Sequence, residues 1–240
     1  MTSSTDDTAA EEPRAQARER LLQAAEQLFA RHGYAGTSLR AVMALADVDT
    51  GAIHYHFRNK LGLLKALFEQ RVMAVNGQRH ALLQRLEQQS PQPAVEDILR
   101  AFIAPALRAA HSEGEADFNR VTALCSVDPD QAVREVVFAA YDEAAKRFAA
   151  LLRQALPQLS QHDFQWRLEC MYGAMMYIRS DNGRVSRMLG GGHRADPVEH
   201  VIDELVAFTA AGFRAAGIRA AAPPRGAVIT TGADQRRRDA

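Results

Sequence analysis

The sequence predicts an all-α protein in which an N-terminal three-helix unit of helix-turn-helix type precedes a larger C-terminal helical bundle. Three observations lead to this prediction. Apolar residues recur three and four positions apart along most of the chain, and no segment shows the sustained polar–apolar alternation of a strand. The 240 residues are 47% hydrophobic, which allows a sizeable core. Between residues 34 and 67, two short helical patterns flank a tight corner.

The N-terminal segment begins with a polar, acidic stretch. We predict that residues 1–13 form a disordered arm, because they contain few groups that a core can bury. The first helix is expected from Ala15 to about Arg31. Its apolar residues share one face and would pack inward: Leu21, Leu22, Ala25, Leu28 and Phe29.

Two short helices follow, and they predict a helix-turn-helix. The first is expected over Ser38 to Leu45, the corner over residues 46–49, and the second over Thr50 to His56. In this arrangement the second helix enters the major groove of DNA. Residues 14–60 are therefore predicted to be a DNA-binding domain.

Local chemistry supports the two helices and their corner. Thr37 or Ser38 can cap the first helix through a side-chain oxygen, and Asp49 is placed to cap the second. Asp47 stands where the corner needs a left-handed residue, which aspartate tolerates better than most. Gly51 lies in the first turn of the second helix, and glycine lets a backbone approach another surface such as a DNA phosphate backbone.

The residues of this segment form a combined pattern. The pattern contains a Thr-Ser start, an apolar pair, a three-residue corner, a glycine, and an aromatic run followed by a lysine. In this sequence these are Thr37-Ser38, Val42-Met43, Ala46-Asp47-Val48, Gly51, Tyr55-His56-Phe57 and Lys60, preceded by Gly33-Tyr34.

From Ala17 to Phe68 the sequence thereby resembles the DNA-binding domain of the TetR (Tet repressor) family of bacterial transcription regulators. Two positions depart from the family pattern: Asp47 replaces the usual corner glycine, and His54 replaces a common tyrosine. The resemblance implies phosphate contacts from Tyr55 and Lys60 and base contacts near the start of the second helix. The implied DNA-binding residues are Thr37, Ser38, Arg40, Thr50, Gly51, Ala52, His54, Tyr55, His56 and Lys60.

Other interpretations of this segment remain open. A three-helix unit can be an ordinary αα corner, and Tyr55 and Phe57 can be core residues; for Phe57 we favour the core. His54 and His56 point in different directions on a helix and are poorly placed to share a metal. The alternative function is a small-molecule-binding helical protein, or an enzyme of unrecognised site, whose N-terminal helices mediate protein contacts.

Residues 61–217 are predicted to form a ligand-binding and dimerisation domain. Prolines and glycines divide it, and Pro105 should kink its helix or begin a new one. From residue 218 the composition predicts a disordered tail. The expected helices are 60–88, 94–110, 116–125, 129–156, 161–188 with a break near Asn182, and 197–216.

This second part resembles, less specifically, the C-terminal domains of TetR-family members that sense long-chain fatty acids or their coenzyme A esters. A stripe of methionine and aromatic side chains suits an apolar pocket, although such a stripe is more often ordinary core. Arg120 or Arg167 could hold a carboxylate or phosphate. The candidate pocket residues are Phe102, Phe118, Arg120, Cys125, Tyr141, Trp166, Met171 and Met175.

The last helices predict a homodimer. The final helix carries more apolar surface than a terminal helix needs, and an exposed apolar stripe usually marks an interface. Small residues permit close helix approach, and the resemblance implies that the last two helices pair with those of a second copy. The candidate interface residues are Gly173, Leu205, Phe208 and Ala211.

Composition narrows the remaining possibilities. Formal net charge is zero, so DNA binding cannot rest on bulk charge. Two cysteines, Cys125 and Cys170, indicate neither a disulfide scaffold nor a zinc site. We find no enzyme motif and expect no metal or cofactor. Without a membrane span or signal peptide, we expect a cytoplasmic protein whose partners are double-stranded operator DNA and a small-molecule effector.

Overall fold

The computed structural model describes residues 6–112, 114–180, 182–191 and 196–215, and this part of the chain is helical without a strand. The side chains of residues 6–13, 50–52 and 54 lie outside the described residues, as does the predicted tail 218–240. The described helices are α1 (Asp6–Gly36), α2 (Leu39–Ala46), α3 (Thr50–Phe57), α4 (Lys60–Gln89), α5 (Val95–Ala110), α6 (Ala116–Ser126), α7 (Gln131–Ala155), α8 (Gln161–Ser180), α9 (Arg184–Met188) and α10 (Val198–Arg214).

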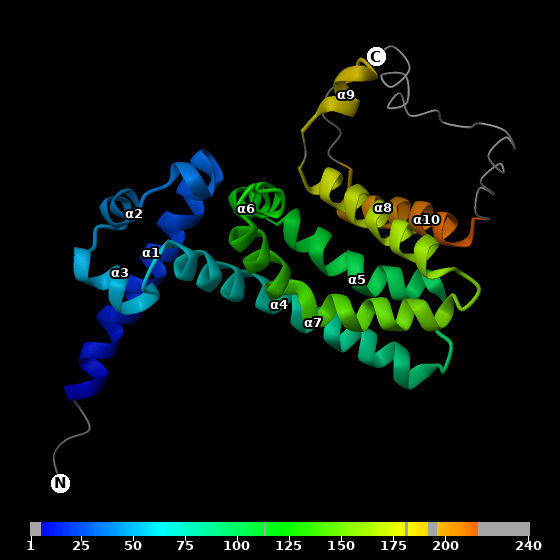
Figure 1. Cartoon of the computed structure of the whole chain (residues 1–240), viewed down its shortest axis with the longest axis horizontal. Coiled ribbons are helices and arrows are strands. Elements are labelled where there is room, and N and C mark those ends of the chain that lie inside the picture. Colours follow the sequence, from blue (N-terminus) through cyan, green and yellow to red (C-terminus); the bar gives the residue numbers. More distant parts are fainter. Residues whose placement is uncertain (1–5, 113, 181, 192–195, 216–240) are drawn as a thin grey trace, which may run out of the picture.

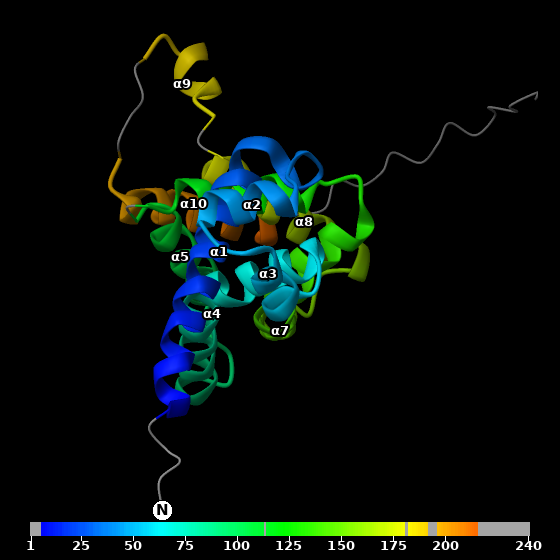
Figure 2. The ribbon, with the colours of Figure 1, turned by 90° about the vertical axis from the view of Figure 1, so that its left-hand side faces the viewer.

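The helices form two groups joined by α4 (Figure 1). Helices α1–α3 lie together at one end, and α4 runs from them into a bundle with α5 and α7, against which α8 and α10 pack. Helix α6 lies between the groups and contacts α1, α7 and α8. The view in Figure 2 looks onto the end that carries α1–α3, with α4 running behind them. The predicted all-α architecture is confirmed.

Two apolar cores correspond to the two groups. One is built from α1, α2, α3 and the first half of α4, together with residues of α6 and α7 such as Phe118 and Val133. The other lies between the second half of α4 and helices α5, α7, α8 and α10. Helix α4 contributes Leu63 to the first core and Leu83 to the second, so residues on both sides of the boundary predicted at residue 60 share the first core.

Local interactions shape the helix-turn-helix as its sequence predicts. Ser38 is the N-cap of α2, and its side chain accepts a hydrogen bond from Ala41 N at 3.2 Å. Asp47 ends α2 in the left-handed conformation, with φ 52° and ψ 57°. Asp49 occupies the N-cap position of α3 but makes no side-chain capping bond. The corner geometry expected for Asp47 is therefore confirmed.

The connection from α3 to α4 depends on a glycine. Asn59 caps α4 by accepting a hydrogen bond from Gly62 N at 2.8 Å. A Cβ atom at Gly62 would lie 2.1 Å from Phe57 O, a separation that no side chain tolerates. This close approach fixes where α4 leaves the helix-turn-helix.

Several element boundaries differ from expectation. Helix α1 begins at Asp6, so the predicted arm is helical from that residue onward; acidic residues favour a helix N-terminus and alanine favours its interior. Pro105 neither ends nor restarts a helix, since α5 is continuous from Val95 to Ala110. The predicted break near Asn182 is confirmed, with Gly183 at φ 67° between α8 and α9. Among the described helices, none combines the length and apolar character that crossing a bilayer requires.

Candidate nucleic-acid interface and ligand-binding domain

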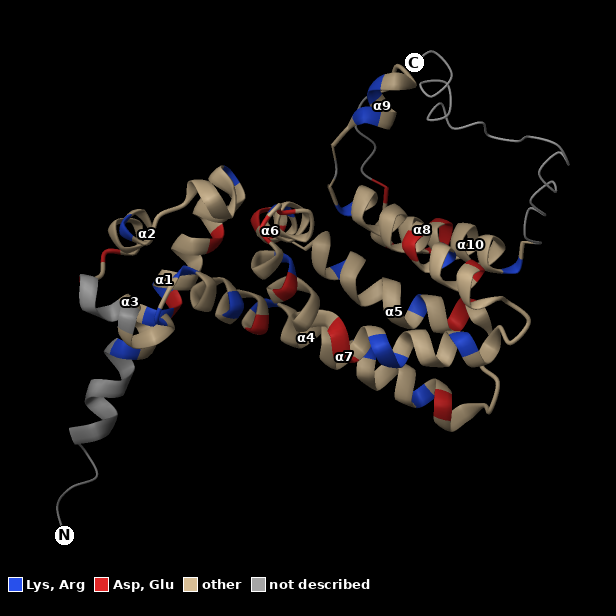
Figure 3. Ribbon diagram, in the orientation of Figure 1, with Lys and Arg blue, Asp and Glu red and all other residues tan. Residues whose placement is uncertain are grey.

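Helix α3 presents an exposed aromatic side chain beside basic residues. Tyr55 is 71% exposed, and the guanidinium of Arg14 on α1 lies 5.9 Å from the centre of its ring. Arg40 is exposed on α2. Basic segments on α2 and at the junction of α3 and α4 are visible at this end of the molecule (Figure 3). A phenol hydroxyl and guanidinium groups arranged in this way can donate hydrogen bonds to phosphate oxygens.

The histidine next to Tyr55 is half-buried. The ring of His56 lies 5.0 Å from that of Tyr55, edge to face. Burial, followed by the nearby charges of Arg18 and Arg14, lowers the pKa of His56 below its usual value, so the neutral imidazole is favoured. Helix α3 contains Thr50, Ala52 and His54, which we predicted to read bases, and Gly51, which we predicted to allow close approach of the backbone to DNA. The side chains of residues 50–52 and 54 lie outside the described residues.

Thr37 has a structural position rather than the predicted DNA-facing one. Its side chain is 3% exposed, and its hydroxyl lies 3.1 Å from Leu28 O and 2.9 Å from Gly33 O. These contacts join the end of α1 to the start of α2. The predicted role of Thr37 in binding DNA is therefore corrected, because a buried hydroxyl with internal partners cannot reach a phosphate.

Lys60 is also engaged within the protein. Its Nζ donates hydrogen bonds to Tyr34 O at 2.7 Å and Thr37 O at 2.9 Å, and lies 4.2 Å from the centre of the Tyr34 ring. An ammonium group has three donors, so one direction is left for a phosphate. The predicted phosphate contact stays a prediction, and the structure adds that Lys60 holds the start of α4 against the α1–α2 corner.

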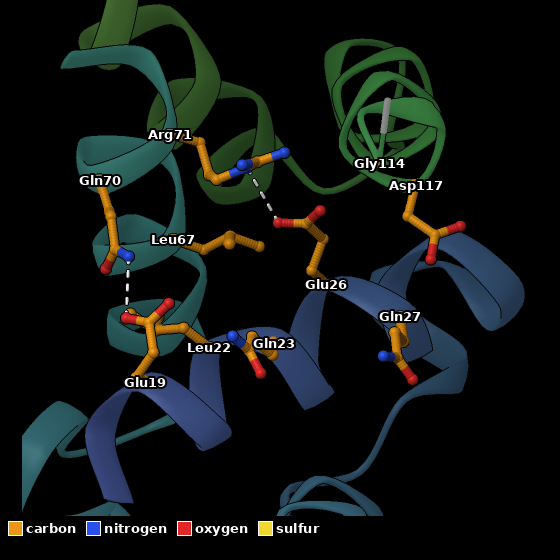
Figure 4. A pocket seen from close by; sticks show the side chains of 10 residues that line it. All are labelled: Glu19, Leu22, Gln23, Glu26, Gln27, Leu67, Gln70, Arg71, Gly114 and Asp117. Carbon is orange, nitrogen blue, oxygen red and sulfur yellow. Dashed lines mark hydrogen bonds and ion pairs between the residues drawn. The ribbon is translucent and has the colours of Figure 1, made fainter. Parts of the chain in front are cut away.

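A network of charged groups, which sequence reasoning missed, joins the helix-turn-helix to the rest of the protein. Arg71 on α4 lies between Glu26 of α1, 3.1 Å away, and Glu115 at the start of α6, 2.8 Å away. Figure 4 shows Glu26 and Arg71 pointing toward each other in the lining of a cavity of about 260 Å³, with Gln70 bonded to Glu19 nearby.

Burial dominates the chemistry of Glu26. Desolvation raises the pKa of its carboxyl to about 7, although Arg71 acts in the opposite direction. The neighbouring carboxylates of Glu115, Asp117 and Glu19 add to the increase. The carboxyl therefore titrates near neutral pH at the junction between the two groups of helices.

The candidate pocket residues do not line a single cavity. Three of them, Phe102, Met171 and Met175, are buried in the core of the larger bundle. Phe118 and Cys125 instead pack in the core that contains the helix-turn-helix, with Tyr141 at its edge. Trp166 is 56% exposed on the surface. The ligand-pocket prediction thus mixed residues from two cores and the surface, because apolar spacing cannot show which core a helix face meets.

An open cleft of about 880 Å³ does lie in this domain, between the end of α5, α6, the end of α8 and the region before α10. Of the predicted pocket residues, Arg120 lines this cleft. Phe118 and Tyr141 line a neighbouring cavity of about 20 Å³, which shares Asn119 and Arg179 with the cleft. Arg167, the other suggested anion ligand, instead donates to Phe213 O and Ala215 O at the end of α10.

The candidate dimer residues differ in exposure: one of them is buried and the others are exposed. Leu205 is 3% exposed and packs in the bundle core, where α10 contacts α5, so its predicted place in a dimer seam is wrong. Phe208 is 69% exposed on the other side of α10, and Ala211 is exposed beside it. Gly173 is exposed on α8.

Comparisons with known proteins agree with this arrangement. Residues 21–67 match the model for bacterial regulatory proteins of the tetR family, and residues 100–212 match the tetracyclin repressor-like C-terminal domain. The HTH-type transcriptional regulator TtgR of Pseudomonas putida is 43% identical over 60 residues. That match covers 25% of this chain and 27% of TtgR, so the chain matches about a quarter of that relative.

Solved structures share this fold at low sequence identity. A putative tetR family regulator from Shewanella sp. PV-4 aligns with a TM-score of 0.58 and 20% identity, over 80% of this chain and 95% of that one. The fatty acid degradation regulator FadR of Bacillus halodurans aligns with a TM-score of 0.57 and 17% identity, over 82% and 96% respectively. With both domain models matched in the expected order, the chain belongs to the TetR family of DNA-binding transcriptional regulators.

Proposed function

We propose that this regulator is a homodimeric repressor that leaves a near-palindromic operator when a small molecule binds its C-terminal domain. The observation that carries the DNA-binding part is Tyr55, exposed on α3 beside Arg14 of α1. An exposed phenol hydroxyl beside a guanidinium group can donate a hydrogen bond to a phosphate oxygen, and tyrosine commonly makes such contacts with DNA.

The dimer part rests on two exposed stripes. On α8, exposed residues recur at helical spacing: Trp166, Cys170, Gly173 and Tyr177. Helix α10, which packs beside α8, exposes Ala207, Phe208, Ala211 and Gly212. Aromatic side chains that alternate with small residues allow two helices to approach closely and bury apolar area. A second copy of the same surface is the partner that closes a twofold interface.

The response to a ligand rests on the position of α6. This helix begins directly after Glu115, whose carboxylate pairs with Arg71 of α4. Arg71 also pairs with Glu26 of α1. Further along, Asn119 and Arg120 line the 880 Å³ cleft. A ligand that displaces α6 would shift this junction and with it the separation of the two α3 helices, which must be about 34–36 Å to read successive major grooves. An acyl compound is our first effector candidate, suggested by the name of the Bacillus halodurans neighbour.

A gel-shift titration with the DNA upstream of the protein's own gene tests the DNA-binding part. Tyr55→Phe removes one donor from each protomer, and hydrogen bonds to charged groups contribute about 1.5–3 kcal/mol. We therefore expect at least tenfold weaker binding of operator and random DNA alike. Tyr172→Phe is the matched control, because its ring packs against Phe102 in the core of the larger bundle. Equal affinities for Tyr55→Phe and the parent would remove α3 from the interface.

A further inference from the structure

The described core of the C-terminal domain contains a cation without a counter-charge. Arg79 on α4 is 2% exposed. Its Nε donates to Phe102 O at 2.9 Å, and its guanidinium carbon lies 3.8 Å from the centre of the Phe102 ring and 5.7 Å from that of Tyr141. Within the described residues no carboxylate pairs with it. One hydrogen bond and two aromatic faces offset only part of the several kcal/mol that burying an ion costs.

A second arginine faces the same region. Arg179 on α8 donates from Nη2 to Asn119 Oδ1 at 2.9 Å, while its buried Nε has no acceptor among the described residues. Its charge lies close enough to act unfavourably on the protonated form of Arg79. Buried donors without a partner are rare in folded proteins and point to a missing acceptor.

Arg79 and Arg179 differ from several other arginines of the described chain in having no carboxylate partner there. Those other arginines form ion pairs with carboxylates on neighbouring helices. The pairs are Arg71 with Glu26 and Glu115, Arg100 with Asp203, Arg108 with Glu199, Arg147 with Glu87, and Arg214 with Glu96. Arg79, which is buried, and Arg179, which is partly buried, form none in the described chain.

The cleft connects this positive region to solvent. Arg179 lines both the 880 Å³ cleft and the 20 Å³ cavity that contains Tyr141. Apolar residues of the cleft wall include Leu124, Ile178 and Val201. Asp117 and Asp196 line the cleft, and Glu115, which pairs with Arg71, lines the smaller cavity. Arg179 lines both and has no ion-pair partner among the described residues. A volume of this order suits a small-molecule ligand.

We propose that the cleft binds an amphipathic organic anion, whose carboxylate or phosphate oxygens accept hydrogen bonds from Arg179 in the field of Arg79. Its apolar part would lie along Leu124, Ile178 and Val201. If this anion is the effector, its role rests on the ligand-responsive function proposed above. Guanidinium groups suit carboxylate and phosphate oxygens equally, because both present paired acceptors to the planar donor fork.

The test uses four probes with one decyl chain and different head groups, each added to the full-length protein below its micelle concentration. Isothermal titration is expected to show binding of decanoate or decyl phosphate, and at least tenfold weaker binding of decanol and decyltrimethylammonium. Comparison of the two anions identifies the preferred head group. Failure of both anions to bind, or equal binding of decanol, contradicts the proposal.

Variants then assign the binding to Arg179. Arg179→Gln removes the charge and is expected to weaken anion binding at least tenfold, whereas Arg179→Lys restores part of it. Arg85→Gln is the control, because Arg85 is exposed on α4. Thermal unfolding is measured for each variant, and a cooperative transition shows that the variant is folded. An unchanged dissociation constant for Arg179→Gln would overturn the assignment.

Gel shifts on the same proteins separate this inference from the proposed function. Anion binding that leaves DNA affinity unchanged supports the anion site and refutes its role as effector site. Release of DNA by decanol or the cationic probe, with both anions inactive, supports the ligand-responsive regulator and refutes the anion site.

Discussion

Glu26 offers a quantitative test of the junction between the DNA-binding helices and the rest of the protein. Its carboxyl has a pKa of about 7 when folded, against 4.5 for an exposed glutamate, mainly because it is buried. The native state then holds a proton that the unfolded chain releases. The stability from this group is therefore fully present below about pH 4.5 and is lost as the pH rises through about 7. A shift of this size corresponds to at most about 3 kcal/mol.

Replacing Glu26 with glutamine removes the titration while retaining size and polarity. At pH 8 the variant should be more stable than the parent, by roughly 1–3 kcal/mol, because a buried carboxylate is absent. At pH 4.5 the two proteins should unfold alike. Urea unfolding at both pH values and fixed protein concentration measures this difference, and Glu69→Gln, at an exposed ion pair on α4, serves as control.

The opposite result would refute the reasoning. Arg71 lies 3.1 Å from Glu26, and a strong ion pair would make the carboxylate net stabilising. If Glu26→Gln lost more than about 1 kcal/mol at pH 8, the attraction of Arg71 would outweigh the cost of burial.

Two further predictions follow from particular contacts. Gly62→Ala should lower the free energy of unfolding by about 1–3 kcal/mol, because its Cβ would lie 2.1 Å from Phe57 O. Gly77→Ala should be neutral or stabilising, since nothing lies within 4 Å of a Cβ there, and the melting temperatures of the two variants test this difference. Phe208→Glu should give folded monomers in sedimentation, because it places a charge in the proposed seam. In those monomers Cys170 should react with a thiol reagent at pH 8, whereas Cys125, whose pKa burial raises to about 12, should react slowly. A dimer that persists in Phe208→Glu would contradict the proposed interface.

Local chemistry explains what the sequence predicted well. The left-handed Asp47, the Ser38 cap and the break at Asn182 each depend on a few adjacent residues whose conformational preferences are strong. The family pattern of the helix-turn-helix adds spacing that few other folds share. These features were therefore predictable without knowing how the helices pack.

Features that depend on tertiary packing could not be predicted from the sequence. Leu205 and Phe208 lie three residues apart on an apolar helix, and only the position of α5 shows which of them is buried. Lys60 was expected to face DNA because the motif places a lysine there, yet its ammonium binds two carbonyls across the α1–α2 corner. Arg79 lies in a stretch with ordinary helical spacing, and no local signal shows that its charge is buried.

Selection of bound sequences from random double-stranded DNA tests the central claim most directly. A dimer that places one α3 helix in each of two successive major grooves should enrich a twofold-symmetric motif with half-sites about 10 base pairs apart, or a multiple of this spacing. Phe208→Glu should lose that enrichment while its α3 helix is unchanged. Failure of the parent protein to enrich any motif, or enrichment of a single asymmetric half-site, would contradict the account.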